Sequence, residues 1–228
     1  MQRNKALGVA LAAILALSAL AAQAASADAL TVNEGASGTT FYTGDQDKAS
    51  WQWSSASGVA ECPTTSISAS SSGASVNETT WAAVYGNCTG FGFAVMHWNH
   101  NGCTYTFTTP TKVKAGEVTW NGSDIHIVCP TGKSIEYTPT SFGVSVCTRF
   151  LSAQTPTSGH VIGTNTGGLG VNEKDVTLDI ALSGIHYTGT GSVCGDSSTH
   201  SDLSWTGKST VRAYSNGGHS TQRGIAFS

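Results

Sequence analysis

Two histidines and a cysteine stand at a spacing that could support metal binding. They form the run His97-x-x-His100-x-x-Cys103, and imidazole and thiolate are preferred ligands of zinc. Residues three apart on a strand face opposite ways, so only a turn between them would gather all three side chains. The cysteine of an exported chain is oxidised and offers no thiolate. We therefore expect surface histidines, and neither a metal site nor a cofactor.

One serine follows a cysteine at the spacing of a known nucleophile segment. Cys194-Gly195-Asp196-Ser197 resembles that segment of trypsin-like serine proteases, in which two glycines follow, whereas Ser198 and Thr199 stand here. The Ala-Ala-His-Cys segment of that family is absent as well. A serine hydroxyl without a base to activate it is a weak nucleophile. We interpret these residues as a turn after a disulfide and assign no catalytic residue.

Two carboxylates share the polar side of one predicted strand. Asp175 and Asp179 are four residues apart, which is about 13 Å along a strand. The carboxyl groups of a glycosidase stand roughly 5–10 Å apart, so solvated strand faces are the better interpretation. A secreted hydrolase acting on polysaccharide stays open as the alternative, because active sites are assembled in space.

Two neighbouring tryptophans are the best candidates for ligand binding. Trp51 and Trp53 are two residues apart and project from one face of a strand. Flanked by Gln52 and Ser54, they would form an exposed platform on which a sugar ring stacks. The alternative is that they belong, with the other four tryptophans, to the core of a chain that has few Leu and Ile residues.

A scaffold of β-strands is predicted to position these side chains. Apolar residues alternate with threonines in Cys103–Thr108 and occupy every second position of Asp175–Leu182. Turn signals recur every 8–12 residues or so along the chain. We expect an all-β fold, a mainly antiparallel β-sandwich stapled by disulfides. Asn101-Gly102 is predicted to turn a hairpin between Phe91–Trp98 and Cys103–Thr109.

Six cysteines are available for these disulfides: Cys62, Cys88, Cys103, Cys129, Cys147 and Cys194. An even number in a secreted chain indicates three disulfides, for which fifteen pairings exist. The separations from Cys62 to Cys88 and from Cys103 to Cys129 are both 26 residues. We predict sequential pairing on that basis, with Cys147 joined to Cys194.

The N-terminal end predicts export. Arg3 and Lys5 precede an apolar run, and Ala22-Gln23-Ala24 is a small-residue cleavage site, so residues 1–24 have the layout of a signal peptide. Without them the chain has 9 basic and 14 acidic residues, a net charge of −5. That charge argues against nucleic-acid binding, which needs a basic face. We expect a protein with no membrane span after processing, secreted or at the cell surface.

The exported part is expected to form one domain. Residues 39–214 are predicted to be β-rich, between a flexible start at 25–38 and a loose tail at 215–228. A split into two sheets or subdomains at 152–158 is the alternative.

Three segments of the sequence also carry a resemblance to a protein family. They are Cys88-Thr89-Gly90-Phe91-Gly92, Asn101-Gly102-Cys103-Thr104-Tyr105-Thr106-Phe107 and Ile127-Val128-Cys129-Pro130-Thr131-Gly132-Lys133-Ser134-Ile135. They resemble a group of exported bacterial β-rich proteins with no assigned function, over roughly residues 62–194. The resemblance implies three disulfides and a location in the bacterial envelope or medium. It implies no catalytic residue, because the shared motifs are cysteines and turns.

These observations favour a non-catalytic extracellular or envelope protein. Its low charge and many Ser, Thr, Asn and Gly residues suit a surface that hydrogen-bonds a neutral glycan or an envelope component, and they equally suit a purely structural role. An outer-membrane barrel is a further option, against which the six cysteines and the lack of repeated ten-residue alternating segments both count.

Overall fold

The computed structural model describes residues 30–32, 38–46, 51–72, 75–76, 78–90, 94–145, 147–166, 175–190 and 197–227. Apart from one 3-10 helix, η1 (Gly122–Asp124), the elements in these residues are β-strands, which confirms the all-β prediction. The predicted signal peptide, residues 1–24, lies outside the described residues. In chain order the strands are β1 (Leu30–Val32), β2 (Thr39–Gln46), β3 (Trp51–Ser55), β4 (Gly58–Cys62), β5 (Thr64–Ser72), β6 (Ser75–Val76), β7 (Thr79–Gly86), β8 (Thr89–Gly90), β9 (Ala94–Asn99), β10 (Thr104–Phe107), β11 (Lys112–Lys114), β12 (Glu117–Asn121), β13 (Ile125–Val128), β14 (Ile135–Ser141), β15 (Val144–Ser145), β16 (Thr148–Leu151), β17 (Ser158–Asn165), β18 (Asp175–Thr190), β19 (His200–Tyr214), β20 (Gln222–Arg223) and β21 (Ile225–Ala226).

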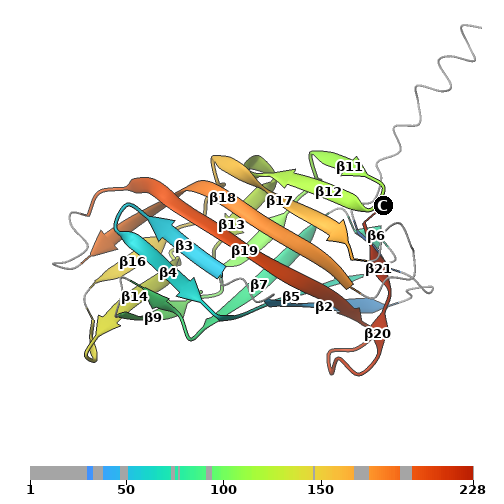
Figure 1. Ribbon diagram of the computed structural model, residues 1–228, viewed down its shortest axis with the longest axis horizontal. Coiled ribbons are helices and arrows are strands. Elements are labelled where there is room, and N and C mark those ends of the chain that lie inside the picture. Colours follow the sequence, from blue (N-terminus) through green and yellow to red (C-terminus); the bar gives the residue numbers. More distant parts are fainter. Residues whose placement is uncertain are drawn as a thin grey trace, which may run out of the picture.

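Eight rows of antiparallel strands close into a barrel (Figure 1). At one end, which we call the mouth, the ring runs β18–β19–β3–β4–β8–β9–β14–β16 and returns to β18. Toward the other end the rows continue as β17–β18–β19–β2–β5–β7–β10–β13. The short hairpin of β11 and β12 extends the sheet beside β17.

Two long strands explain why the sheet closes instead of forming the expected sandwich. β18 and β19 are 16 and 15 residues long and cross the molecule diagonally in Figure 1. β19 pairs with β2 through Ser209–Tyr214 and with β3 through Ser204–Thr206, so the first rows are hydrogen-bonded to the last. Closure satisfies the edge groups that two separate sheets would leave open.

The residues at the alternative boundary, 152–158, do not separate two sheets. The strands on either side of them, β16 and β17, both pair with β18. The backbone of Gln154 also bridges to Ile127 of β13. This segment therefore lies within one row of the barrel.

The predicted hairpin at Asn101-Gly102 is wrong, although the turn itself is present. Asn101 and Gly102 both have positive φ, 48° and 81°. However, β9 pairs with β8 and β14, whereas β10 pairs with β7 and β13. The turn therefore bends one long row of the barrel and does not reverse it. A two-residue turn signal identifies the backbone conformation but not the partner of each strand.

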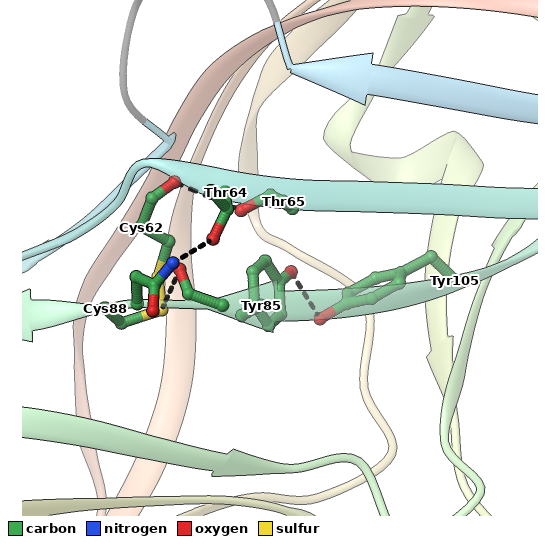
Figure 2. Close-up of a disulfide and its surroundings, with 8 residues drawn as sticks. Cys62, Thr64, Thr65, Tyr85, Cys88 and Tyr105 are labelled. Carbon is green, nitrogen blue, oxygen red and sulfur yellow. Dashed lines mark hydrogen bonds between the residues drawn. A yellow bond between two sulfur atoms is a disulfide. The ribbon is translucent and has the colours of Figure 1, made fainter.

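Two disulfides confirm the predicted pairs Cys62–Cys88 and Cys103–Cys129, with Cα–Cα distances of 4.0 and 4.1 Å. Each one lies where neighbouring rows bend. Figure 2 shows the first, beside which Thr65 Oγ1 donates to the carbonyl of Cys62 at 3.2 Å. Cys147 is also disulfide-bonded, and its predicted partner, Cys194, lies outside the described residues.

The segments on either side of residues 39–214 also contain strands. In the segment expected to be a flexible start, β1 pairs with β6 and β21. In the segment expected to be a loose tail, Ile225 and Phe227 are buried. The side chain of Asn165 accepts from the Phe227 N–H at 2.8 Å and donates to its carbonyl at 3.2 Å. Ile225 and Phe227 therefore belong to the buried core.

Candidate functional site

Trp51 and Trp53 lie inside the barrel and not on an exposed platform. Their side chains are 0 % and 2 % exposed, so the expectation of an exposed pair is wrong and the core alternative describes them. β3 lies between β4 and β19 in the closed ring, and the face that carries both tryptophans is the inner one. In a chain with few large aliphatic residues, aromatic rings fill this space.

These rings form a continuous cluster across the interior. Trp53 and Trp205 are stacked, with centroids 5.2 Å apart and planes 6° from parallel. Trp98 lies 5.3 Å from Trp53 and 4.9 Å from Tyr85. This part of the barrel is a packed core, so a ligand site has to be sought at the surface of the mouth.

A row of stacked groups leads from the core to the mouth. The guanidinium carbon of Arg149 lies 5.7 Å from the centroid of the Tyr137 ring and 4.9 Å from that of Tyr187. His200 also stacks on Tyr187, with ring centroids 5.0 Å apart and an angle of 18° between the planes. β14, β16, β18 and β19 supply these four residues. Cation–π contacts of this kind are strongest where water is excluded.

Buried hydrogen bonds hold Arg149 in place. Its Nη1 donates to the Tyr137 hydroxyl at 3.1 Å, and its Nη2 donates to Ser57 Oγ at 2.6 Å. Burial raises the pKa of Tyr137 to about 12, although the neighbouring guanidinium acts in the opposite direction. The Tyr137 hydroxyl therefore stays neutral, and Arg149 ties the β3–β4 turn to the barrel wall.

A groove of about 630 Å³ lies over this row, between the β3–β4 turn and the start of β19. We call it the mouth groove, and its lining is Ala56, Ser57, Tyr187, Thr199, His200, Ser201 and Asp202. A second hollow of about 230 Å³ shares Tyr187 and Thr199 with it and extends toward Gln154 and His186. The amide of Gln154 fixes that side, because it donates to the His186 carbonyl and accepts from the His186 N–H.

Asp202 is the charged group of the mouth groove. Its Oδ2 accepts a hydrogen bond of 2.6 Å from the backbone N–H of Ala56. This bond lowers the pKa of the exposed Asp202 carboxyl below its ordinary value. The carboxylate is ionised at neutral pH, and as an acceptor it could also bind a donor group of a ligand.

The groove therefore offers mixed polar groups around an aromatic support. The hydroxyls of Ser57, Thr199 and Ser201 both donate and accept, while Asp202 only accepts. Ser198 Oγ lies 3.5 Å from His200 Nε2, at the outer limit of a hydrogen bond. Such a set suits a ligand that presents many hydroxyl groups.

Sequence reasoning did not single out Tyr187, His200 or Asp202. One signal was available, because Ser198, His200 and Asp202 alternate and so share one face of a strand. Ser57, which lines the same groove, is more than 100 residues away from all of them in the chain, and Arg149 is 38 residues from Tyr187, on which it packs. Only the closed barrel brings these residues together.

The other candidate residues of the sequence lie apart from the groove. His97 is exposed, His100 stacks on Tyr85 at 5.0 Å inside the barrel, and Cys103 is in a disulfide. Within the described residues, no group of three or more His, Cys, Asp or Glu side chains could hold a metal ion.

The two candidate carboxylates lie on the outer wall. Asp175 contacts Arg212 at 3.4 Å, and Asp179 is exposed opposite Lys208 on the neighbouring strand. Of the serine segment, Ser197 is exposed, and residues 194–196 lie outside the described residues.

In comparisons with known proteins, no family model, no curated protein and no solved structure matches this chain. A search of the described residues finds no helix that is both long and apolar enough to span a membrane.

Proposed function

We propose that this protein is an exported, non-catalytic β-domain that binds a neutral glycan of the cell surface or its surroundings in the mouth groove. The observation that carries this proposal is the groove itself, in which an anchored carboxylate, an imidazole and three hydroxyls surround the Tyr187–His200 stack. Sugar hydroxyls can both donate and accept hydrogen bonds, and a carboxylate accepts hydrogen bonds from them. The disulfides indicate an oxidising environment, which agrees with export.

Retention on polysaccharides, with two matched aspartate variants, tests this function. The protein is incubated with insoluble polysaccharides and with purified bacterial cell envelope, and the bound fraction is measured. Asp202→Asn keeps an acceptor for the Ala56 N–H but removes the charge, and Asp179→Asn makes the same change on the outer wall. A hydrogen bond to a charged group is worth about 1.5–3 kcal/mol, so Asp202→Asn should weaken retention roughly tenfold or more.

The control and a second variant make the result specific. Asp179→Asn should bind like the unchanged protein, whereas His200→Ala should bind as weakly as Asp202→Asn. Equal retention of Asp202→Asn and the unchanged protein, or no retention on any matrix, would contradict the proposal.

A secreted hydrolase is the second candidate, and the Ser198–His200 contact favours it. A serine close to an imidazole is the beginning of a nucleophile–base pair, and the ester groups of a modified polysaccharide would be its substrates. Release of acid from an acetylated polysaccharide, lost in both Ser198→Ala and His200→Ala, would support this activity over simple binding.

A further inference from the structure

The mouth end also carries an exposed apolar tip, which we define as Phe142 and Val144. Phe142 occupies the turn between β14 and β15 and is fully exposed, at 103 %. Val144 follows on β15 at 67 %. The end of β14 projects at the lower left of Figure 1. The tip therefore lies at an end of the barrel and is open to solvent.

Phe142 is unfavourable in its place for two independent reasons. Phe142 and Gly143 both have positive φ, 51° and 77°, as in the two-residue turns that favour Asn-Gly. A bulky side chain at positive φ is strained. Full exposure means that its ring gains no packing within the protein. A strained backbone and an exposed ring that give the folded protein no stabilisation indicate that Phe142 contacts a binding partner.

The area and the charge of the apolar tip indicate which kind of partner it contacts. Two exposed side chains offer a few hundred Å² at most, well below the 1,200 Å² or so of a stable protein–protein interface. None of the ten residues from Pro139 to Thr148 is charged, and none is a histidine. A small, uncharged, exposed apolar surface suits the interface of a bilayer, which needs no complementary pocket. Without the predicted signal peptide the chain has a net charge of −5, so anionic lipid offers no added attraction.

We propose that the apolar tip inserts into the interface of a zwitterionic lipid bilayer and holds the mouth end against it. This binding does not depend on the glycan proposal, because no residue of the tip lines the mouth groove. A membrane-facing mouth would place the groove next to whatever polymer covers that membrane.

Co-sedimentation with phosphatidylcholine vesicles at millimolar lipid tests the insertion. Phe142→Asn should weaken binding at least fivefold, and its Tm should be unchanged or higher, because Asn suits the turn. Val144→Thr should also weaken binding. Val84→Thr is the matched control, since Val84 is 66 % exposed on the barrel wall and its replacement should leave binding unchanged. Replacing a fifth of the lipid by phosphatidylglycerol should not increase binding.

Fluorescence gives a second measurement at the tip itself. The native tryptophans are buried or packed against the core, so Phe142→Trp adds an exposed emitter whose spectrum should shift to the blue when vesicles are added. Three results would overturn the proposal: no sedimentation of the unchanged protein, equal sedimentation of Phe142→Asn, or Phe142-dependent self-association in ultracentrifugation, which would make a second copy of the chain the partner.

Discussion

At the scale of single residues, His100 is a neutral imidazole enclosed by aromatic rings. It stacks on Tyr85 at 5.0 Å and meets Tyr105 edge-on at 6.4 Å. Its Nε2 is buried without a hydrogen-bond partner among the described residues. Burial lowers the pKa of His100 to about 4. Protonation of this ring would leave a charge in an apolar surrounding, so folding favours the neutral form.

This environment predicts loss of stability in mild acid. His100 has an ordinary pKa of 6.5 and a folded pKa of about 4, so the unfolded chain binds more protons between these values. The free energy of unfolding should fall as the pH is lowered through that window, by up to about 3 kcal/mol. Urea unfolding at pH 7.5, 5.5 and 4 measures it.

Two histidine variants control this experiment. His100→Phe keeps an aromatic ring against Tyr85 and should lose most of the pH dependence, whereas His97→Gln, at an exposed position, should keep it. Asp202 has a lowered pKa, so it changes the free energy of unfolding only below about its ordinary pKa of 3.8, which is outside this window. The same slope in His100→Phe and the unchanged protein would show that other groups cause it.

At the scale of elements, the two disulfides join rows of the barrel where those rows bend. Cys62 ends β4 just before β5 begins, and Cys103 follows the turn between β9 and β10. Ladder hydrogen bonds are interrupted at such bends, and a covalent link between neighbouring rows keeps them together. Both links close loops of the same length, a separation of 26 residues.

Equal loops predict equal stabilisation. Replacing Cys62 and Cys88 by Ala, or Cys103 and Cys129 by Ala, should each cost about 3.5 kcal/mol if chain entropy dominates. Urea unfolding of the two double variants compares them directly. A difference of more than about 1 kcal/mol between them would show that packing in the folded state, and not loop entropy, sets their contribution.

Gly207 illustrates how β19 accommodates the aromatic core. A Cβ atom at this position would lie 2.6 Å from Cδ1 of Trp51, and Trp51 Nε1 donates to the carbonyl of Lys208 at 3.1 Å. Gly207→Ala should therefore destabilise the protein by roughly 1–3 kcal/mol through overpacking. Thr206→Ala, on the exposed side of the same strand, is the control in chemical denaturation and should cost less than about 1 kcal/mol. Equal effects would mean that the indole moves aside freely.

At the scale of the whole molecule, two phenylalanines lie toward opposite ends of the barrel in opposite environments. Phe227 packs edge-on against Trp120 at 5.9 Å and covers Gly163. Phe142 is fully exposed at the mouth. Phe227→Ala should cost roughly 3–5 kcal/mol, whereas Phe142→Ala should leave the free energy of unfolding within about 0.5 kcal/mol. Thermal unfolding compares the two variants, and a small effect at Phe227 would show that the tail is dispensable.

The strand periodicity and the cysteine spacing were readable in the sequence because both are local. The alternation in Asp175–Leu182 indicates one buried face, whichever strands lie beside it. The equal separations of Cys62–Cys88 and Cys103–Cys129 reflect neighbouring rows of similar length. The aromatic core was readable only as one of two alternatives for Trp51 and Trp53. An inner barrel face and an exposed sheet face have the same period of two.

Barrel closure and the mouth groove were decided by tertiary structure alone. Closure depends on β19 pairing with β2 and β3, which lie about 150 residues earlier in the chain. The groove needs Ser57 from the β3–β4 turn and Asp202 from the start of β19, and the N–H of Ala56 in that turn donates to Asp202. Contacts between such distant residues leave no period or spacing in a single sequence, so neither the barrel nor its mouth could be derived from residue order.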